Sequence, residues 1–365
     1  MVVNARPETD RPVNIAVLGC GAVTSIYYAP ALLQLERSKV VRVAALFDPD
    51  REALLQVGRQ FPSARRMRNS KDLAGADLAI VASPPQHHAE QSIEALRAGV
   101  AVLCEKPMAS ALPEGEAMAA AAEKAGGLLA VGLVRRFLPA TQAIRMILAN
   151  RMLGDLRSVA CFEGGPFRWP ARTPSFFDRS QGGVLLDIGA HVLDLLAWWL
   201  GVPQGIEYED DAMGGVAANC RFLLQYDFGF RVEGHLSRDW ELPNRYYFDC
   251  ARGWMNWTPM EPGFVQIGFH HAPFTLNAEL HQNSICFARP GTGRRGINFE
   301  QAFVAEIENL VQVLRGNASL VVPAVEALTS LRLIHQCLQQ RRLMKIPWLA
   351  ESEETFARVQ ARGAG

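Results

Sequence analysis

The sequence predicts an α/β protein in which an N-terminal doubly wound parallel sheet is followed by an α+β domain with an open, mainly antiparallel or mixed sheet. Three observations carry this prediction. Short apolar runs recur in the first third of the chain, helical patterns separate them, and alternating, aromatic-rich strands follow residue 135. Because 365 residues exceed the length of one average domain, we expect two domains, at residues 1–134 and 135–365.

Five apolar runs are expected to be buried strands of the first domain: "NIAVLG", "VVRVAALFD", "DLAIVAS", "GVAVLCE" and "GLLAVGLV". Runs without polar alternation suit parallel strands that are covered on both faces. Segments with helical spacing separate them, among them "REALLQVGRQF", "HHAEQSIEALRAG" and "GEAMAAAAEKAG". Such alternation is typical of a doubly wound sheet. The basic cluster "ARRMR" is interpreted as a solvated loop or helix end.

A glycine-containing turn, "VLGCGAVTS", follows the first strand. Gly19 permits a tight turn, and Gly21 lets the backbone approach a pyrophosphate where the next helix begins. Ala22 and Val23 continue this turn and belong to the predicted cofactor site. Thr24 replaces the usual third Gly or Ala, and would either hold helix and strand further apart or place its hydroxyl near a phosphate. An ordinary glycine turn is the alternative for this motif taken alone.

A carboxylate ends the second strand, in "AALFDPD". Asp48 stands where folds of this kind accept hydrogen bonds from the hydroxyls of the adenosine ribose. Its charge would repel a 2′-phosphate, so we expect NAD as the cofactor in preference to NADP. The alternative role is capping of the next helix, which Asp50 could equally fill, and Arg51 leaves some tolerance of NADP.

Composition and charge argue against several classes of function. The 37 basic and 37 acidic side chains balance, so neither nucleic acid nor an acidic lipid surface is expected as a partner. The apolar stretches are too short for a bilayer span and no export signal is visible, so we expect a cytoplasmic protein with no membrane partner. Seven scattered cysteines form no C-x-x-C pair, and no Cys/His spacing indicates a metal site.

One of only five lysines, Lys106, follows the fifth apolar run in "VLCEKPMAS". Pro107 keeps Lys106 extended at the carboxyl end of the strand, and that edge is where open α/β sheets bind ligands. The ammonium could hydrogen-bond a substrate hydroxyl and stabilise negative charge as an alcohol loses its proton. Glu105 is expected to help hold it. The alternative is a lysine that caps the next helix or pairs with a surface acid.

A polar stripe marks the helix predicted for "VLLDIGAHVLDLLAWWL", where Asp187, His191 and Asp194 recur at helical spacing. Burying these groups without partners would cost roughly 2–7 kcal/mol each, so we expect them to line a cleft or to be fully hydrogen-bonded. A satisfied core histidine is the alternative for His191, but the flanking acids and the Gly182-Gly183 turn favour catalysis. Asp194 could be structural.

Aromatic and basic residues precede that helix in "FRWPARTPSFFDRS". Trp169 and Arg172 are candidates for binding a sugar, whose apolar ring face stacks on aromatic rings and whose hydroxyl or acidic groups bind a guanidinium. A packed surface loop is an equally open alternative. Arg136, in "VRRF" at the end of the first domain, is a further candidate for substrate contact.

Alternating strands with aromatic residues predict the second sheet, in "LRSVACFEG", "GVAANCRFLLQYDFGFRVEGHLS", "NRYYFDCARGWMNW" and "GFVQIGFHH". One face of this sheet should meet helices. The last helical patterns, "FVAEIENLVQVLRGN" and "VEALTSLRLIHQCLQQ", are expected to pack back on the first domain.

Together these motifs resemble the Gfo/Idh/MocA family, which includes glucose–fructose oxidoreductase and inositol dehydrogenase. The resemblance rests on "SPPQHHAE" followed by "GVAVLCEKP", on "VGLVRRF", on "GGVLLDIGAHVLDLL" and on the closing helices. It implies a Rossmann-type cofactor domain to which Ser83, Pro84, His88, Glu105 and Lys106 contribute. Thr24, Val134 (where asparagine is frequent) and the segment 164–181 depart from the family pattern.

The resemblance implies an NAD(H)-dependent oxidoreductase that transfers hydride to or from a secondary alcohol or ketone of a sugar, cyclitol or related polyol. His191 would exchange the proton of the reacting oxygen, Lys106 would stabilise that oxygen, and Asp187 would bind a neighbouring hydroxyl or tune the pair. Which of Lys106 and His191 is the acid/base stays open. A homo-dimer or tetramer through the second sheet is also implied. The alternatives are an NAD-dependent glycosidase of the same family and a non-catalytic sugar sensor.

Overall fold

The structure, a computed structural model, describes residues 11–170, 177–178, 183–281, 284–290 and 299–345. The chain divides into two compact units. The first comprises residues 1–137, 170–172 and 299–328, and the second comprises residues 138–169, 173–298 and 329–365. One unit has a parallel sheet and the other a mixed, mostly antiparallel sheet, so the predicted fold class is confirmed.

The first unit is built on a six-stranded parallel sheet with the order β3-β2-β1-β4-β5-β6. Its strands are β1 (Val13–Leu18), β2 (Val41–Phe47), β3 (Arg65–Arg66), β4 (Leu78–Val81), β5 (Ala101–Glu105) and β6 (Leu129–Gly132). The chain runs outward from β1 to β3 and then returns to the other side of β1 with β4. This reversal makes the carboxyl ends of β1 and β4 the place where such sheets bind ligands.

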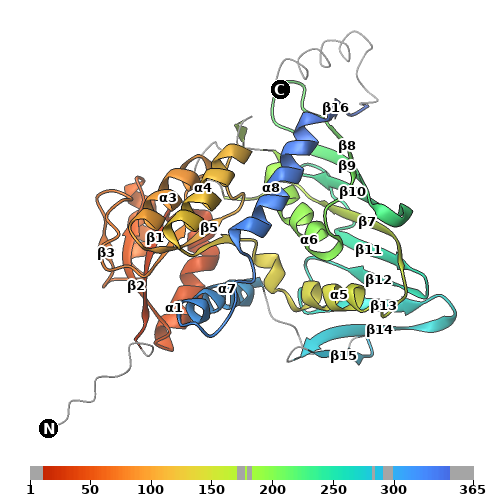
Figure 1. Cartoon of the computed structure of the whole chain (residues 1–365), viewed down its shortest axis with the longest axis horizontal. Helices are drawn as coiled ribbons and strands as arrows, with labels where there is room; N and C mark the ends of the chain where they lie inside the picture. The colour runs from red at the N-terminus through yellow and green to blue at the C-terminus, as the bar shows by residue number, and fades with distance from the viewer. Residues whose placement is uncertain (1–10, 171–176, 179–182, 282–283, 291–298, 346–365) are drawn as a thin grey trace. The chain divides into compact units, whose positions relative to one another are not determined.

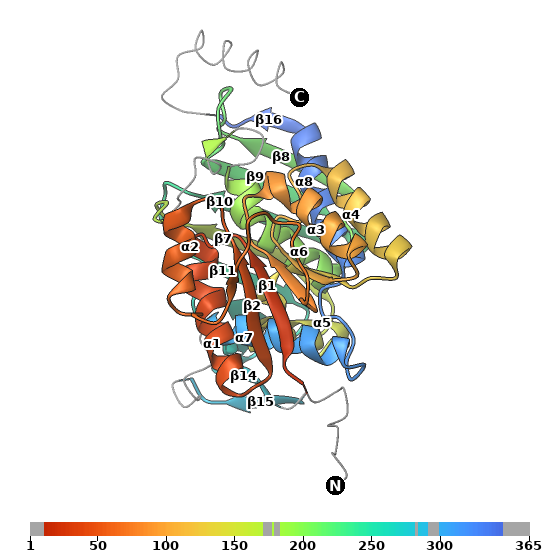
Figure 2. The ribbon, with the colours of Figure 1, turned by 90° about the vertical axis from the view of Figure 1, so that its left-hand side faces the viewer.

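Helices cover both faces of this sheet. Among the described residues, the helical segments that lie wholly in this unit are η2 (Thr24–Tyr28), α1 (Ala29–Arg37), α2 (Arg51–Gly58), η3 (Pro85–His87), α3 (His88–Arg97), α4 (Leu112–Ala125), η4 (Val134–Phe137) and α7 (Phe299–Leu314). Figure 2 shows α1 and α2 on one face and α3 and α4 on the other. Because β1, β4 and β5 are covered on both sides, nearly all of their side chains are buried, which explains their unbroken apolar sequences.

Local hydrogen bonds fix where the helices begin and end. The Asp50 carboxylate accepts the N–H groups of Glu52 and Ala53, at 2.8 and 3.3 Å, and so caps α2. The helix-capping role that was also open for Asp48 therefore belongs to Asp50. At the C-terminal end of another helix, α4, Gly126 adopts a left-handed conformation with φ 56° and terminates the helix.

The basic cluster "ARRMR" differs from its expected form. Arg65 and Arg66 form the short edge strand β3 beside β2. The Arg65 side chain pairs with Asp72, and the Arg66 guanidinium donates to the carbonyls of Gly58 and Ala64, at 2.6 and 2.5 Å. These bonds to the end of α2 and the following turn hold the segment extended.

The second unit contains a ten-stranded sheet with the order β15-β14-β13-β12-β11-β7-β10-β9-β8-β16. Its strands are β7 (Leu156–Gly164), β8 (Gly205–Asp210), β9 (Asn219–Gln225), β10 (Arg231–Ser237), β11 (Arg245–Cys250), β12 (Gly253–Trp257), β13 (Phe264–Phe269), β14 (Ala272–His281), β15 (Ser284–Ala288) and β16 (Arg341–Leu343). The β10–β7 and β16–β8 pairs are parallel and the other pairs are antiparallel, as predicted for a mixed, mainly antiparallel sheet.

The helical segments of the second unit are α5 (Pro139–Ala149), η6 (Leu185–Gly189), α6 (Ala190–Leu200) and η7 (Asp227–Gly229), while α8 (Ala324–Gln339) is divided between the two units. In Figure 1, α5 and α6 lie beside the sheet, where α5 contacts β13, β14 and α6. Trp199 of α6 packs edge-on against Tyr246, Phe248 and Trp257 of the sheet, with ring centroids 5.5–6.1 Å apart. This aromatic cluster anchors α6, the helix that carries the polar stripe.

Within the described residues, no helix combines the length and apolar character needed to cross a membrane. All seven cysteines are free, and Cys286 alone among them is exposed. The six others act as small apolar side chains in the two cores.

Candidate functional site

Gly19 closes the turn at the end of β1. Its N–H donates to the Phe47 carbonyl at 2.8 Å, and its φ of +104° lies in the left-handed region. A Cβ at this position would lie 2.5 Å from the carbonyl carbon and oxygen of Ala82, and 2.6 Å from the Ser83 nitrogen. A side chain would therefore push apart the loops that follow β1 and β4, so the position requires glycine.

Gly21 has the opposite environment. A Cβ built on it would meet no atom within 4 Å, so open space lies over the backbone where the loop enters η2. Ala22 and Val23, which follow, are half-buried. Backbone N–H groups at the beginning of a helical segment, with open space in front of them, fit the pyrophosphate of a dinucleotide.

Asp48 is held in place by two backbone groups. Its Oδ2 accepts the N–H of Cys20 at 2.6 Å, and its Oδ1 accepts the N–H of Asp50 at 2.7 Å. Each carboxylate oxygen keeps acceptor capacity for a ribose hydroxyl. Burial, and after it the charge of Asp48, raises the pKa of the Cys20 thiol to about 12. The carboxylate is thus fixed at the end of β2, beside the glycine turn.

Thr24 uses its hydroxyl inside the turn. Its Oγ1 is buried and donates to the Gly19 carbonyl at 2.7 Å, and the Ser25 hydroxyl donates to the Cys20 carbonyl at 3.4 Å. Both acceptors lie five residues earlier, where the π-helical turn η2 replaces the expected beginning of an α-helix. Thr24 therefore locks the glycine turn, and this bond replaces the phosphate contact considered from the sequence.

His88 joins two loops of the site. It is 1% exposed, and its ring nitrogens lie 2.9 Å from the Pro107 carbonyl and 2.8 Å from the Ser83 carbonyl. Burial lowers its pKa. Because the ring is enclosed, we assign His88 a positioning role instead of the direct cofactor contact expected. The Ser83 hydroxyl is itself oriented by Gln91, at 2.8 Å, and the neighbouring Pro84 is half-buried.

Lys106 stands at the carboxyl end of β5, where it is half-buried and joined to Pro107 by a cis peptide bond. The Glu105 Oε2 accepts the Lys106 backbone N–H at 2.9 Å, and Oε1 accepts the Tyr28 hydroxyl at 2.7 Å. Glu105 is 6% exposed. Burial raises its pKa, whereas the Tyr28 hydrogen bond and the Lys106 charge lower it. Glu105 thus holds Lys106 as expected, but it faces the core instead of a cofactor.

The helix of the polar stripe begins with the π-helical turn η6, where the sequence predicts an α-helix. Its beginning is fixed by a hydrogen bond from the Val184 N–H to the Ala217 carbonyl, at 2.9 Å. A Cβ on Gly189 would lie 2.8 Å from Leu185 and 3.4 Å from Leu236 of β10. The absence of a side chain at this glycine therefore lets η6 lie close to the sheet.

The polar stripe is exposed to different degrees along its length. Asp187 and His191 are half-buried, whereas Asp194 is 2% exposed. Asp187 pairs with Arg238, whose guanidinium carbon lies 5.7 Å from the centroid of the Phe167 ring. Asp187 and His191 are therefore the members of the stripe that could reach a ligand, and Asp194 takes the structural role that the sequence left open.

Arg238 is a candidate that sequence reasoning missed. It directly follows β10, and its carbonyl accepts the Phe167 N–H at 2.8 Å, so it is tied to the "FRW" segment. Its position after a strand, next to an acid in "SRDW", was the available indication. Trp169 is half-buried. Arg172 lies outside the described residues.

Arg136 corrects one expectation. Its side chain is 2% exposed and pairs with Glu326, and it also donates to the Val321 carbonyl at 3.4 Å. All three residues belong to the first unit, where Arg136 ties η4 to the later segment. This placement argues against the substrate contact expected for it.

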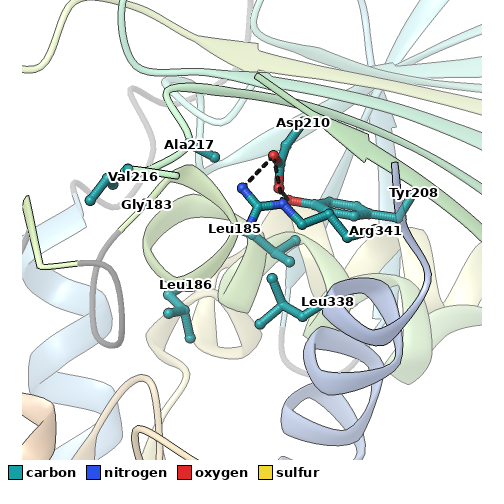
Figure 3. A pocket seen from close by; sticks show the side chains of 10 residues that line it. Gly183, Leu185, Leu186, Tyr208, Asp210, Val216, Ala217, Leu338 and Arg341 are labelled. Atoms are coloured by element: carbon teal, nitrogen blue, oxygen red, sulfur yellow. Dashed lines mark hydrogen bonds and ion pairs between the residues drawn. The ribbon is translucent and has the colours of Figure 1, made fainter. Parts of the chain in front are cut away.

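A small pocket in the second unit has a partly buried ion pair in its wall (Figure 3). It is lined by Gly183, Leu185, Leu186, Tyr208, Asp210, Gly215, Val216, Ala217, Leu338 and Arg341. Asp210 is 1% exposed. Its carboxylate accepts hydrogen bonds from Arg341, at 2.9 and 2.7 Å, and from the Tyr208 hydroxyl, at 2.9 Å. Burial raises the pKa of Asp210, and these partners lower it. The pair ties β16 to β8.

In the part of the chain that the structure describes, no three His, Cys, Asp or Glu side chains gather to hold a metal.

Two family profiles match the chain in consecutive segments. The profile described as "Oxidoreductase family, NAD-binding Rossmann fold" matches residues 13–133. The profile described as "GFO/IDH/MocA C-terminal domain" matches residues 141–256. The first match covers the glycine turn and Lys106, and the second covers the helix with Asp187 and His191.

Curated relatives and a solved structure are also similar to the chain. The trans-1,2-dihydrobenzene-1,2-diol dehydrogenase of Sus scrofa is 30% identical over 246 residues, which are 63% of this chain and 70% of that protein. The scyllo-inositol 2-dehydrogenase (NADP(+)) of Bacillus subtilis (strain 168) is 24% identical over 211 residues, and the match spans 56% of each chain, little more than half of that relative. Levoglucosan dehydrogenase, in complex with NADH and levoglucosan, shares the fold: its TM-score is 0.76 at 16% identity, over 90% of this chain and 97% of that one.

Proposed function

The chain belongs to the Gfo/Idh/MocA family of oxidoreductases, and on this premise we propose that it is an NAD(H)-dependent dehydrogenase or reductase of a cyclic polyol. The observation that carries the proposal is the arrangement at one edge of the first sheet. The glycine turn after β1, Asp48 after β2 and Lys106 after β5 all stand at the carboxyl ends of parallel strands, where a dinucleotide and its reacting partner bind in such folds.

The cofactor would be held by the loops that follow the strands. The backbone from Gly19 to Val23 would bind the pyrophosphate, Asp48 would accept the ribose hydroxyls, and Ser83 and Pro84 would border the cofactor. When bound, the nicotinamide supplies or takes up the hydride. NAD is proposed over NADP because the Asp48 carboxylate would repel a 2′-phosphate.

The proton of the reacting oxygen is assigned to the chain's own side chains. When an alcohol is oxidised, its O–H proton would pass either to His191, with the Lys106 ammonium stabilising the oxygen as the proton leaves, or to Lys106 itself in its neutral amine form. Asp187, held by Arg238, would accept a hydrogen bond from a neighbouring hydroxyl or tune His191. Which of the two groups takes the proton stays open in this proposal.

The substrate class is proposed from chemistry that two relatives share. Inositol and trans-1,2-dihydrobenzene-1,2-diol are both six-membered rings with neighbouring hydroxyl groups, so a sugar or cyclitol with a vicinal diol suits this chain. Phe167 and Trp169 offer aromatic surface for a ring face, and Arg238 offers donors for hydroxyls. The glycosidase and sensor alternatives are not favoured, because both relatives are named dehydrogenases. The homo-oligomer through the second sheet and the cytoplasmic location stay predictions.

A panel of sugars and inositols, assayed for NADH formation, tests the proposal. With a substrate in hand, we expect Lys106→Met and His191→Asn each to lower turnover by a factor on the order of 10² or more. Affinity for NAD should stay within a few-fold of the unsubstituted protein. Lys124→Met, which removes an exposed lysine of α4, is the matched control.

Two outcomes would contradict the proposal. Cleavage of an aryl glycoside without net NADH formation would identify the glycosidase instead. A Lys106→Met protein that loses NAD binding but keeps its turnover at saturating NAD would make Lys106 a cofactor ligand and not a catalytic residue.

A further inference from the structure

Three buried side chains form a hydrogen-bonded chain behind Lys106, within the first unit. The Tyr28 hydroxyl lies 2.7 Å from Oε1 of Glu105 and 3.3 Å from Oε2 of Glu306. The three residues come from η2, β5 and α7, and their exposures are 0%, 6% and 2%. A phenol is thus held between two carboxyl groups in the core of the unit.

The geometry distinguishes the two carboxyl groups. Tyr28 has one proton, and the shorter distance directs it to Glu105. Both oxygens of Glu105 accept hydrogen bonds, from Tyr28 and from the Lys106 N–H, as an ionised carboxylate requires. Oε1 of Glu306 is buried without a hydrogen-bond partner among the described residues, which suits a neutral acid whose proton lies between Glu306 and the Tyr28 oxygen.

Burial and repulsion support the same distribution of charge. Two ionised carboxylates on either side of a buried phenol would repel each other in a medium of low dielectric constant. Burial, and after it the charge of Glu105, raises the pKa of Glu306 well above its ordinary value. Burial also raises the pKa of Glu105, but the Tyr28 hydrogen bond and the Lys106 charge oppose that increase.

We propose that Tyr28 and Glu306 are positioning residues for Lys106. A neutral Glu306 donates to Tyr28, Tyr28 donates to Glu105, and Glu105 stays the single ionised carboxylate, which fixes the Lys106 backbone and favours the charged form of the lysine side chain. The link to catalysis rests on the proposed function, but the assignment of the charge does not.

The neighbouring titratable groups leave this assignment unchanged. Cys104, which precedes Glu105, is buried, and its thiol pKa is raised by burial and further by the charge of Glu105, so it stays neutral. The pKa of Tyr27, which precedes Tyr28 in the sequence, is also raised, chiefly through burial. On η4, the Arg136 guanidinium is paired with Glu326, and Lys106 is the cation whose charge lowers the pKa of Glu105.

Lysine-selective NMR can test the charge assignment without substrate or cofactor. The chain has five lysines, so protein labelled with ¹³C at lysine Cε gives few signals, and Lys106→Met identifies the one from Lys106. We expect Glu105→Gln to move the titration midpoint of Lys106 to lower pH by about one unit or more, because a neighbouring negative charge is lost. Tyr28→Phe should move it in the same direction by less. Glu306→Gln should leave it in place, because a neutral amide replaces a neutral acid and still donates to Tyr28.

Two controls separate this effect from loss of stability. Tyr208→Phe removes another buried phenol–carboxylate hydrogen bond, from Tyr208 to Asp210 in the second unit, and should not move the Lys106 midpoint. Glu308→Gln changes an exposed acid on α7 and should also have no effect. If Glu105→Gln does not fold, the comparison of Tyr28→Phe with Tyr208→Phe still tests the proposal.

Either of two results would overturn the proposal. A shift with Glu306→Gln as large as the shift with Glu105→Gln would place the charge on Glu306. If Tyr28→Phe did not shift the Lys106 titration midpoint, the hydrogen-bonded chain of Tyr28, Glu105 and Glu306 would be purely structural. Because the titration needs no turnover, a protein without dehydrogenase activity would still give a result. In an active enzyme, Tyr28→Phe should shift the pH profile of kcat in the same direction as the Lys106 midpoint and leave the Kd for NAD unchanged.

Discussion

The two glycines of the dinucleotide loop should respond in opposite ways to alanine. At Gly19 the new Cβ would lie 2.5 Å from the Ala82 carbonyl group, at φ +104°, and backbone atoms cannot move aside as a flexible side chain can. A strained φ costs about 1–3 kcal/mol and overpacking about 1–3 kcal/mol, so Gly19→Ala should lose roughly 2–6 kcal/mol of unfolding free energy. At Gly21 a Cβ meets nothing within 4 Å, so stability should change by less than about 1 kcal/mol.

For cofactor binding we expect the substitution at Gly21 to be the one with the large effect, although it barely changes stability. The Cβ of Gly21→Ala would enter the open space assigned to the pyrophosphate, and we expect NAD affinity to fall about tenfold or more, equivalent to about 1.4 kcal/mol. Urea unfolding of the cofactor-free protein measures the first effect, and calorimetric titration with NAD measures the second. Gly99→Ala is the matched control, since Gly99 has φ +77° with no atom within 4 Å of its Cβ and so reports the cost of a positive φ alone.

Two results would refute this reasoning. If Gly19→Ala were no less stable than Gly99→Ala, the loops after β1 and β4 would not be as close as the structure has them. If Gly21→Ala bound NAD as well as the unsubstituted protein, the pyrophosphate would lie elsewhere.

Three further predictions concern charge and thiol chemistry. Asp48→Ser should narrow or reverse the preference for NAD over NADP in binding titrations, and equal affinities for both cofactors before substitution would contradict the role of Asp48. A thiol reagent should modify one cysteine in the native protein, Cys286, and all seven after denaturation; rapid native reaction of the Cys286→Ser variant would contradict the burial of the others. Since burial raises the pKa of Glu306 above its ordinary value of 4.5, its contribution to stability is complete below about pH 4.5 and declines as the pH rises toward the raised pKa. Glu306→Gln should therefore gain urea stability relative to the unsubstituted protein above that pH, and a difference independent of pH would contradict a neutral Glu306.

The sequence predicted the parts of the fold that depend on local pattern. Strands β1, β2, β4, β5 and β6 coincide with apolar runs, because a strand covered on both faces requires apolar side chains throughout. Gly19 and Gly21 were identified by their position between a strand and a helix. The periodicity of the sequence did not predict the π-helical turns η2 and η6. The turn η2 depends on neighbouring hydroxyl groups, and η6 depends on close packing against the sheet.

Polar partners distant in sequence could not be predicted. Tyr28 and Glu306 are 278 residues apart, and Asp187 and Arg238 are 51 apart, so no local spacing connects them. His88 was interpreted as a ligand contact from the family resemblance, and Arg136 from its position at the end of the first domain. Both are instead satisfied inside the first unit, by backbone carbonyls and by Glu326, and that distinction requires the tertiary structure.

The first unit is assembled from stretches of chain that leave the ribosome at different times. Residues 1–137 are made early, but α7, which supplies Glu306 and packs on α1, belongs to residues 299–328. While most of the second unit is being synthesised, Tyr28 and Glu105 of the early segment therefore lack their packing against α7. We expect residues 1–137 produced alone to be unstable or to aggregate, and addition of a peptide spanning 299–328 to improve their solubility. Completion of the first unit thus depends on prior synthesis of most of the second unit, so a chain that stopped before residue 299 would lack the packing of α7 on the first unit and the contact of Glu306 with Tyr28.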